Sequence, residues 1–341
     1  MSGNAFIRSV RQTTHGPALE TLHRVHVAIT RPDGSLVGSA GAPDYTSPMR
    51  SCLKPFQAQA LLRSGAFERF SSTSDELAIA CASHEANVVH TDLVKRWLDR
   101  LGLSVSSLQC GPHPPADKES IAAMTASGEM PTALHNNCSG KHTGMLAAAL
   151  ALGADPRRYL HAQSPVQLMV RAALEDHLPT QHAAPAWGVD GCSAPTPVLS
   201  MTQLATLYAR LIAASTGHVD DRGLGQTALA MMEHPELVGG RGVIDTRLMR
   251  SLKNLVAKRG ADGVYAMGFL HPEHGPIGVG LKVEDGSDLA RAPAVLATLA
   301  ALGALIPATR VALGDLIRPE RKNYRGLLVG ALVADLAFVF T

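Results

Sequence analysis

Residues 50–55 (RSCLKP) contain the first side chains whose types and spacing can do chemistry. Positions i and i+3 are neighbours on a helix, so the Lys54 amine can reach the Ser51 hydroxyl one turn earlier. A serine attacks a carbonyl when a neighbouring base takes its proton, and a nearby cation such as Arg50 favours the neutral, basic form of an amine. The motif also occurs by chance in many helices, and Pro55 disfavours helical backbone at Lys54. Alone, it indicates a nucleophile–base pair only weakly.

A second serine, Ser83, lies in the polar segment 81–87 (CASHEAN). Thr73 and Glu76 have the spacing of a capping box, which predicts a short helix that ends just before this segment. A helix that ends in this way can present polar side chains to a cleft. The alternative is an ordinary helix end whose polar residues are solvated.

Two thiols and an amine suggest a metal site. The segment 135–144 (HNNCSGKHTG) places Cys138, Lys141 and His142 within about one helical turn. It lacks the first glycine and the preceding strand of a phosphate loop, which excludes nucleotide binding there. One thiol is too few for zinc, but Cys192 in the segment 187–195 (WGVDGCSAP) can supply a second. The alternative is a pair of buried thiols without a ligand.

A late lysine, Lys258, lies among small residues in the segment 257–263 (AKRGADG), directly before an expected strand. A lysine at a strand edge can approach a cleft closely, although such lysines are more often solvated. Lys282 is a rival of the same kind, on the polar face of the following strand.

The order of these features resembles that of serine β-lactamases, penicillin-binding proteins and serine glutaminases. Ser83-His84-Glu85 and Lys258-Arg259-Gly260 depart from the β-lactamase motifs, which argues against β-lactam chemistry. A closer resemblance is to the asparaginase II family, the class 3 or rhizobial-type L-asparaginases, and it extends from about residue 25 to 333. Five segments carry it, at 50–57, 81–87, 135–146, 187–197 and 257–268.

This resemblance implies hydrolysis of L-asparagine to L-aspartate and ammonia on a serine β-lactamase-like fold, by a homodimer. The roles it implies are two Ser–Lys pairs, Ser51 with Lys54 and Ser83 with Lys258; zinc ligands Cys138, Lys141 and Cys192; and substrate-binding residues Arg50, Asn136 and Asp190. Asp190 would pair with the substrate ammonium group. The zinc site lacks the His-rich shell of catalytic zinc, so we expect zinc to organise the pocket without generating the attacking hydroxide.

Either serine can be the nucleophile. Analogy with Ser-x-x-Lys enzymes favours Ser51, whose backbone N–H at a helix N-terminus would also stabilise an oxyanion. In the alternative, Ser83 attacks and Ser51 relays a proton. Two other functions compete with an asparaginase, namely a serine glutaminase or broader amidase, and a non-catalytic ligand-binding relative.

The elements that position these residues are suggested by periodicity. Alternating apolar residues predict a hairpin around Pro32-Asp33-Gly34 and a second one across 264–283. Helical periodicity appears between them and after the second hairpin, at 93–101, 144–152, 164–177, 204–212 and 290–305. The sequence therefore predicts an α+β fold, with an antiparallel sheet built from both termini, flanking helices and an inserted, mostly helical lobe. We expect a single catalytic domain over 1–341, with the sheet at about 20–50 plus 240–341 and the helical region at about 51–239.

Composition fits an enzyme. The chain has 341 residues, 46% of them hydrophobic and 18% charged, which supports a sizeable core. Its 31 Lys+Arg and 29 Asp+Glu give a net charge of +2 with no basic block, which argues against nucleic-acid binding. No apolar run approaches the roughly 18 residues of a membrane span, and no signal peptide is evident. Five scattered cysteines indicate free thiols and a cytoplasmic location.

Overall fold

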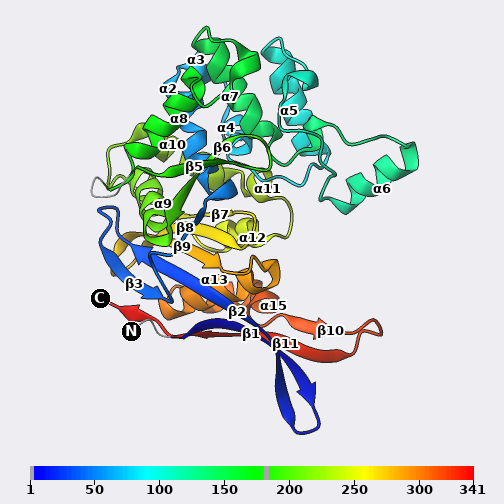
Figure 1. Ribbon diagram of the computed structural model, residues 1–341, viewed down its shortest axis with the longest axis vertical. Coiled ribbons are helices and arrows are strands. Elements are labelled where there is room, and N and C mark those ends of the chain that lie inside the picture. The colour runs from blue at the N-terminus through cyan, green and yellow to red at the C-terminus, as the bar shows by residue number, and fades with distance from the viewer. Residues whose placement is uncertain (1–3, 180–183) are drawn as a thin grey trace. The chain divides into compact units, whose positions relative to one another are not determined.

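Segments from both ends of the chain form one antiparallel sheet in the computed structural model, which describes residues 4–179 and 184–341 (Figure 1). The chain divides into two compact units. Unit 1 comprises Met1–Met49, Leu199–Ile212 and Arg247–Thr341, and unit 2 comprises Arg50–Val198 and Ala213–Thr246. The expectation of a single catalytic domain stays a prediction.

The sheet of unit 1 has the strand order β10-β11-β1-β2-β9-β8-β7, with β3 beside β2 and β12 beside β3. The strands are β1 (Ala5–Thr13), β2 (Gly16–Thr30), β3 (Leu36–Ala40), β7 (Leu255–Arg259), β8 (Val264–His271), β9 (Gly275–Val283), β10 (Glu320–Lys322), β11 (Leu328–Leu336) and β12 (Val339–Phe340); β4 (Thr46–Pro48) also lies in this unit. This arrangement confirms the predicted sheet built from both termini.

Both predicted hairpins are present. The turn after β2 is closed by Asp33, whose Oδ1 accepts a hydrogen bond from the Ser35 backbone N–H at 2.9 Å, and Val27 then faces Ala40 across β2 and β3. In the second hairpin, Val264 on β8 faces Lys282 on β9. The sequence pattern did not indicate β1 or the lower half of β2, which form a long hairpin that extends beyond the rest of the sheet (Figure 1).

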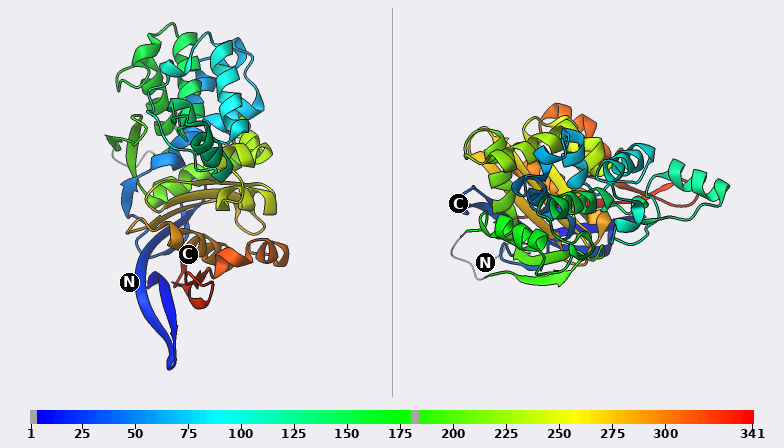
Figure 2. Two further views of the ribbon diagram at one scale, coloured as in Figure 1. Left: turned by 90° about the vertical axis from the view of Figure 1, so that its right-hand side faces the viewer. Right: turned by 90° about the horizontal axis from the view of Figure 1, so that it is seen from above.

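Helix α9 (Met201–Ser215) lies directly on the sheet of unit 1, against glycines of β8 and β9. A Cβ atom at Gly278 would lie 1.9 Å from the Ala205 carbonyl oxygen, and one at Gly280 would lie 2.3 Å from that of Met201. The alternate positions of β9 face the other way, where α13 (Asp288–Ala301) packs (Figures 1 and 2). Both faces are therefore covered, and the face that carries Lys282 is buried instead of solvated.

Helix α9 of unit 1 begins at a capping box formed by Ser200 and Gln203. The Ser200 N–H donates to Gln203 Oε1 at 2.9 Å, and the Gln203 N–H donates to Ser200 Oγ at 3.1 Å. The other helices here are α14 (Pro307–Ala312), α15 (Gly314–Ile317) and most of α12 (Ile244–Ser251).

Unit 2 is mostly helical, and its central helix is α7 (Ser139–Ala151), which α2, α3, α4, α5 and α8 contact. Its elements are η1 (Arg50–Leu53), α1 (Lys54–Gln57), α2 (Gln59–Arg63), α3 (Ala66–Arg69), α4 (Ser74–Ala80), α5 (Val88–Arg100), η2 (Val105–Ser107), α6 (Lys118–Ser127), η3 (Ala133–His135), η4 (Pro156–Arg158), α8 (Pro165–Glu175), α10 (Arg222–Glu233) and α11 (Pro235–Gly239), with strand β5 (Ala186–Val189) paired to β6 (Pro195–Ser200). Helix α6 has no buried residue and stands away from the other helices of this unit (Figures 1 and 2).

Candidate active site

The turn that carries Ser51 is a 3-10 helix, η1, and not the start of one continuous α-helix. Pro55 occupies the first turn of α1, where its missing N–H costs nothing, and this allows the chain to change helix type at Lys54. Arg50 has a φ of +50°, in the left-handed region that non-glycine residues seldom adopt. Strain of this kind concentrates at functional sites.

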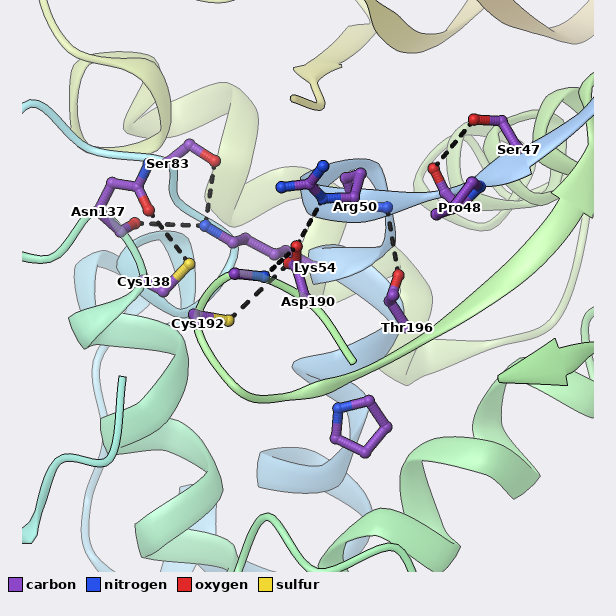
Figure 3. A network of polar contacts seen from close by, with 12 residues as sticks. Ser47, Pro48, Arg50, Lys54, Ser83, Asn137, Cys138, Asp190, Cys192 and Thr196 are labelled. Atoms are coloured by element: carbon purple, nitrogen blue, oxygen red, sulfur yellow. Dashed lines mark hydrogen bonds and ion pairs between the residues drawn. The ribbon is translucent and has the colours of Figure 1, made fainter. Parts of the chain in front are cut away.

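The Lys54 amine is buried and contacts Ser83 (Figure 3). Its Nζ donates to Ser83 Oγ at 3.0 Å, to the Ala82 carbonyl oxygen, and to the Asn137 carbonyl oxygen at 3.3 Å. Lys54 is 1% exposed and Ser83 is 5% exposed. Within the part of the chain that the structure describes, the Ser51 hydroxyl makes no hydrogen bond, so the expected contact from Ser51 to Lys54 is not formed. The tight η1 turn accounts for this, since it leaves the lysine side chain to extend toward the end of α4.

The segment after α4 holds Ser83 in place through its neighbours. Thr73 and Glu76 form the predicted capping box at the start of this helix. The Ser83 N–H donates to the Val238 carbonyl oxygen at 2.8 Å. The next residue, His84, accepts from the Ala86 N–H at Nδ1 (3.1 Å), so its Nε2 donates to Ser139 Oγ (2.9 Å). Burial lowers the pKa of His84 well below its usual value, which keeps the ring neutral.

Asp190 and Arg50 form an ion pair beside Lys54 and Ser83, with Arg50 Nε 2.6 Å from Asp190 Oδ1. Asp190 lies in a tight turn, where its Oδ1 also accepts from the Gly191 N–H at 2.8 Å. Burial raises the pKa of Asp190, but the charges of Lys141 and Arg50 outweigh burial and hold it below its usual value. The turn thus presents a partly buried carboxylate and a guanidinium side by side.

Cys138, at the start of α7, and Cys192, in the turn after β5, lie near each other (Figure 3). Lys141 Nζ donates to Cys192 Sγ at 3.0 Å. A hydrogen bond from Cys192, together with the charges of Lys54 and Lys141, lowers the pKa of Cys138 well below that of an ordinary thiol. Burial lowers the pKa of Lys141, but the charges of Cys138 and Cys192 outweigh burial and raise it.

This donor set fits a zinc ion, to which Lys141 would bind as the neutral amine after losing the proton that it shares with Cys192. Tetrahedral zinc with Zn–S of about 2.3 Å and Zn–N of about 2.0–2.1 Å separates nitrogen from sulfur by about 3.5 Å, so Lys141 and Cys192 would part by about half an ångström. Among the described residues, no group of three or more His, Cys, Asp or Glu side chains is arranged to hold a metal, so a site here would combine the two thiols with the Lys141 amine. The buried His142 Nε2 has no hydrogen-bond partner in residues 4–179 and 184–341. An unpartnered buried donor beside a thiol is expected where a metal-bound thiolate would accept from it.

The remaining predicted residues lie in two places. Asn136 borders the thiols, where its Nδ2 donates to the Cys110 carbonyl oxygen at 2.9 Å and its Oδ1 accepts from the Cys138 N–H at 2.9 Å. These bonds position the thiol loop. Lys258 on β7 and Lys282 on β9 belong to unit 1, where both amines are buried and donate to backbone carbonyls of Arg259 (2.9 Å) and Glu284 (3.2 Å), respectively.

The sequence reasoning missed three neighbours of the site. It assigned nothing to the Asn137 carbonyl oxygen, to His84 or to Tyr159, which bonds to His142. Asn137 and His84 lie inside the motif segments 135–144 and 81–87. Residue types alone, however, predict neither which backbone carbonyl accepts a hydrogen bond nor how an imidazole ring is oriented. Tyr159 lies outside every such segment.

Comparison with known proteins identifies the class. A family model described as L-asparaginase II matches residues 11–334, nearly the whole chain. The chain is therefore an amidohydrolase. It belongs to the L-asparaginase II family.

Solved structures of two kinds resemble the chain at low identity. A probable glutaminase from Bacillus subtilis, complexed with 6-diazo-5-oxo-L-norleucine, is 11% identical, with 82% of this chain and 84% of that chain covered and a TM-score of 0.40. A beta-lactamase from Burkholderia ambifaria is 14% identical, with 82% and 94% covered and a TM-score of 0.38. A search of curated proteins found no match. No helix among the described residues is both long and apolar enough to cross a membrane.

Proposed function

We propose that the chain hydrolyses L-asparagine to L-aspartate and ammonia through a serine ester. Membership of the L-asparaginase II family supports this substrate. The observation that carries the mechanism is the 3.0 Å hydrogen bond from Lys54 Nζ to Ser83 Oγ, because a nucleophile and its base must lie within such a distance. Ser51, which the Ser-x-x-Lys analogy favours, has no such contact, so we propose Ser83 as the nucleophile.

The proposed reaction proceeds in two halves. A neutral Lys54 amine has two N–H groups for the Ala82 and Asn137 carbonyl oxygens, so its lone pair accepts the hydrogen of the Ser83 hydroxyl. Ser83 Oγ attacks the side-chain amide carbon while this proton passes to Lys54. The oxyanion accepts a hydrogen bond from the Ser51 N–H, which donates to no backbone carbonyl in the described residues. Lys54 returns the proton to the leaving nitrogen, the C–N bond breaks, and ammonia leaves. Water then cleaves the ester with Lys54 again taking a proton, and Ser83 recovers its hydroxyl hydrogen.

The charged groups of the substrate match the Arg50–Asp190 pair. An α-carboxylate suits the Arg50 guanidinium and an α-ammonium suits the Asp190 carboxylate, so the bound amino acid would replace one ion pair by two. We propose that Cys138, Lys141 and Cys192 hold a zinc ion next to this pair. When bound, zinc supplies positive charge that fixes the pocket walls. A site with two thiolates lacks the donor set of catalytic zinc, so no step requires it.

Trapping the ester tests the mechanism. A diazo-ketone analogue of asparagine should modify Ser83, and peptide mass spectrometry locates the label. A label on Ser51 alone would reverse the two serine roles. Ammonia release from asparagine and from glutamine measures the substrate preference, and a faster reaction with glutamine at equal concentration would make the protein a glutaminase.

The second lysine and the assembly are also part of the proposal. Lys258 is proposed as the second lysine of the site, with Lys282 as the rival. A homodimer is proposed from the family resemblance, and the mass in solution, measured by light scattering, checks it; the mass of a single chain would contradict it.

A further inference from the structure

A chain of buried hydrogen bonds runs from the backbone to the ring of His142 within unit 2. The Gln109 N–H donates to the Tyr159 hydroxyl at 2.9 Å, and Tyr159 Oη lies 2.6 Å from His142 Nδ1. Both side chains are 0% exposed, and the two rings meet edge to face with centroids 5.6 Å apart. No element of the proposed reaction uses these residues.

The direction of this chain follows from its first donor. A backbone N–H can only donate, so Tyr159 Oη accepts from Gln109 and has its own hydrogen to give. The nearest acceptor for that hydrogen is His142 Nδ1. A ring nitrogen that accepts a hydrogen bond carries no proton of its own, so Nδ1 of His142 is unprotonated. The single ring proton of His142 is therefore on Nε2.

The ring of His142 interacts with the Cys192 thiol. Because Tyr159 occupies Nδ1, the nitrogen left for this thiol is Nε2, which is buried and makes no hydrogen bond of ordinary geometry within the described residues. An unsatisfied buried donor costs about 1–3 kcal/mol, and a thiolate at Cys192 would remove that cost by accepting from it. We propose that Tyr159 and His142 are positioning residues that aim an N–H donor at Cys192 and so strengthen its hold on zinc.

This assignment rests on the zinc site of the proposed function, and it removes His142 from the ligand set. The sequence leaves open that His142 itself binds the metal, one turn from Cys138. A neutral imidazole binds metal through its unprotonated nitrogen. In His142 that nitrogen is Nδ1, which Tyr159 already occupies. The ring consequently acts on zinc through Cys192.

The experiment combines a spectroscopic and a binding measurement on the full chain. Long-range ¹H–¹⁵N correlation spectra of histidine-labelled protein report which ring nitrogen is protonated, and the His142→Gln spectrum assigns the signal. Zinc affinity is measured by competition with a chromophoric chelator. Tyr159→Phe and His142→Leu should each lower zinc affinity about 10- to 100-fold, the usual effect of removing a partner of a metal ligand. His142→Gln, which keeps an N–H donor at the Nε2 position, should lose less than His142→Leu.

Tyr208→Phe is the matched control, since it removes a buried phenol hydroxyl from unit 1 and should leave zinc affinity unchanged. The proposal is supported by an Nε2–H ring in the wild type together with the loss in Tyr159→Phe. It is overturned by an Nδ1–H ring, which can be read even if the variants fail to fold, or by equal zinc affinity in wild type and Tyr159→Phe. Absence of zinc binding in the wild type would overturn the zinc site and this proposal together, whereas asparagine hydrolysis could persist.

Discussion

Among the described residues, each unit buries two lysine side chains, and the partners of the two pairs differ. Lys258 and Lys282 of unit 1 donate to backbone carbonyls one or two residues along the chain. Lys54 and Lys141 of unit 2 donate to Ser83 and to Cys192. A hydroxyl or thiol can exchange a proton with an amine, which a backbone carbonyl cannot do. The partners of Lys54 and Lys141 therefore suit these two lysines to proton transfer.

The largest expected effect comes from breaking the pair in unit 2. Ser83→Ala and Lys54→Met should each lower kcat for asparagine by about 10⁴-fold or more, and the double variant should lose little beyond either single one, because residues that act as a unit are not additive. Steady-state ammonia release measures this. Activity of Ser83→Ala within tenfold of wild type would remove Ser83 as nucleophile.

Substitution of the lysines of unit 1 should give the next largest effect on kcat. It distinguishes Lys258 from Lys282 as the second lysine of the site. If Lys258 is the second lysine, Lys258→Met should lower kcat by about 10²- to 10⁴-fold, the usual contribution of a general acid or base. Lys282→Met should then stay within threefold, because the Lys282 amine, held by the Glu284 carbonyl oxygen, would take no part in the reaction. The opposite ranking would exchange the two roles.

A packing change in unit 1 should affect stability without touching the lysines of unit 2. Gly278→Ala places a Cβ 1.9 Å from the Ala205 carbonyl oxygen, so α9 must move off the sheet, at a cost of about 3 kcal/mol. Gly314→Ala is the control, because no atom lies within 4 Å of its added Cβ. Urea unfolding compares them, and equal midpoints would contradict the packing described for α9.

Removal of zinc should have a smaller effect, confined to substrate affinity. Chelation of the protein should raise KM for asparagine about tenfold, roughly 1.4 kcal/mol of binding, with kcat nearly unchanged. Readdition of zinc should restore KM. Complete loss of kcat on chelation would instead assign the metal a direct part in the reaction.

The smallest effect is expected at the periphery of unit 2. Asp117 caps α6 by accepting from the Ser120 N–H at 2.8 Å, and Ser120 lowers its pKa. A carboxyl group whose pKa falls on folding stabilises the folded state at every pH above its unfolded pKa of about 3.9. This contribution is lost as the pH drops through the pKa that the group has in the folded state. Asp117→Ala should therefore lower the free energy of local unfolding of α6 by about 1 kcal/mol at pH 7, and by less at pH 3.

Hydrogen exchange along α6, corrected for intrinsic rates, measures that change. Asp117→Asn keeps a capping oxygen that does not titrate, so it should stay close to wild type at pH 7. A fall in catalytic rate in Asp117→Ala would show that the periphery and the lysine site are coupled.

Short-range features of the fold were predictable from sequence, and long-range ones were not. The capping box at Thr73 and the turn at Asp33 depend on neighbours within four residues, and both are confirmed. Strand β11 lies inside the sheet, between β10 and β1, although these three strands come from opposite ends of the chain. Helix α6 has no clear periodicity, whereas α10 and α12 are amphipathic and were not predicted. Pairing between distant strands leaves no signal in one sequence.

The candidate site followed from the family resemblance, and its details followed only from coordinates. The spacing of Cys138 and Cys192 along the chain is only weak evidence for a metal site. The turn after β5 brings the two thiols together, and the spacing alone does not predict that turn. The partner of Lys54 was misjudged since i, i+3 proximity assumes an α-helix, and η1 is a tighter helix that changes type at Lys54. Roles of these residues remain to be measured by the variants above.

The left-handed backbone at Arg50 has a consequence for engineering. Glycine adopts this conformation freely, so Arg50→Gly would relieve about 1 kcal/mol of backbone strain. The same exchange would leave the partly buried Asp190 carboxylate without its ion-pair partner, a loss that offsets this gain. Backbone strain and charge pairing therefore oppose each other at a single position, and directed evolution of this protein should screen stability and substrate recognition together.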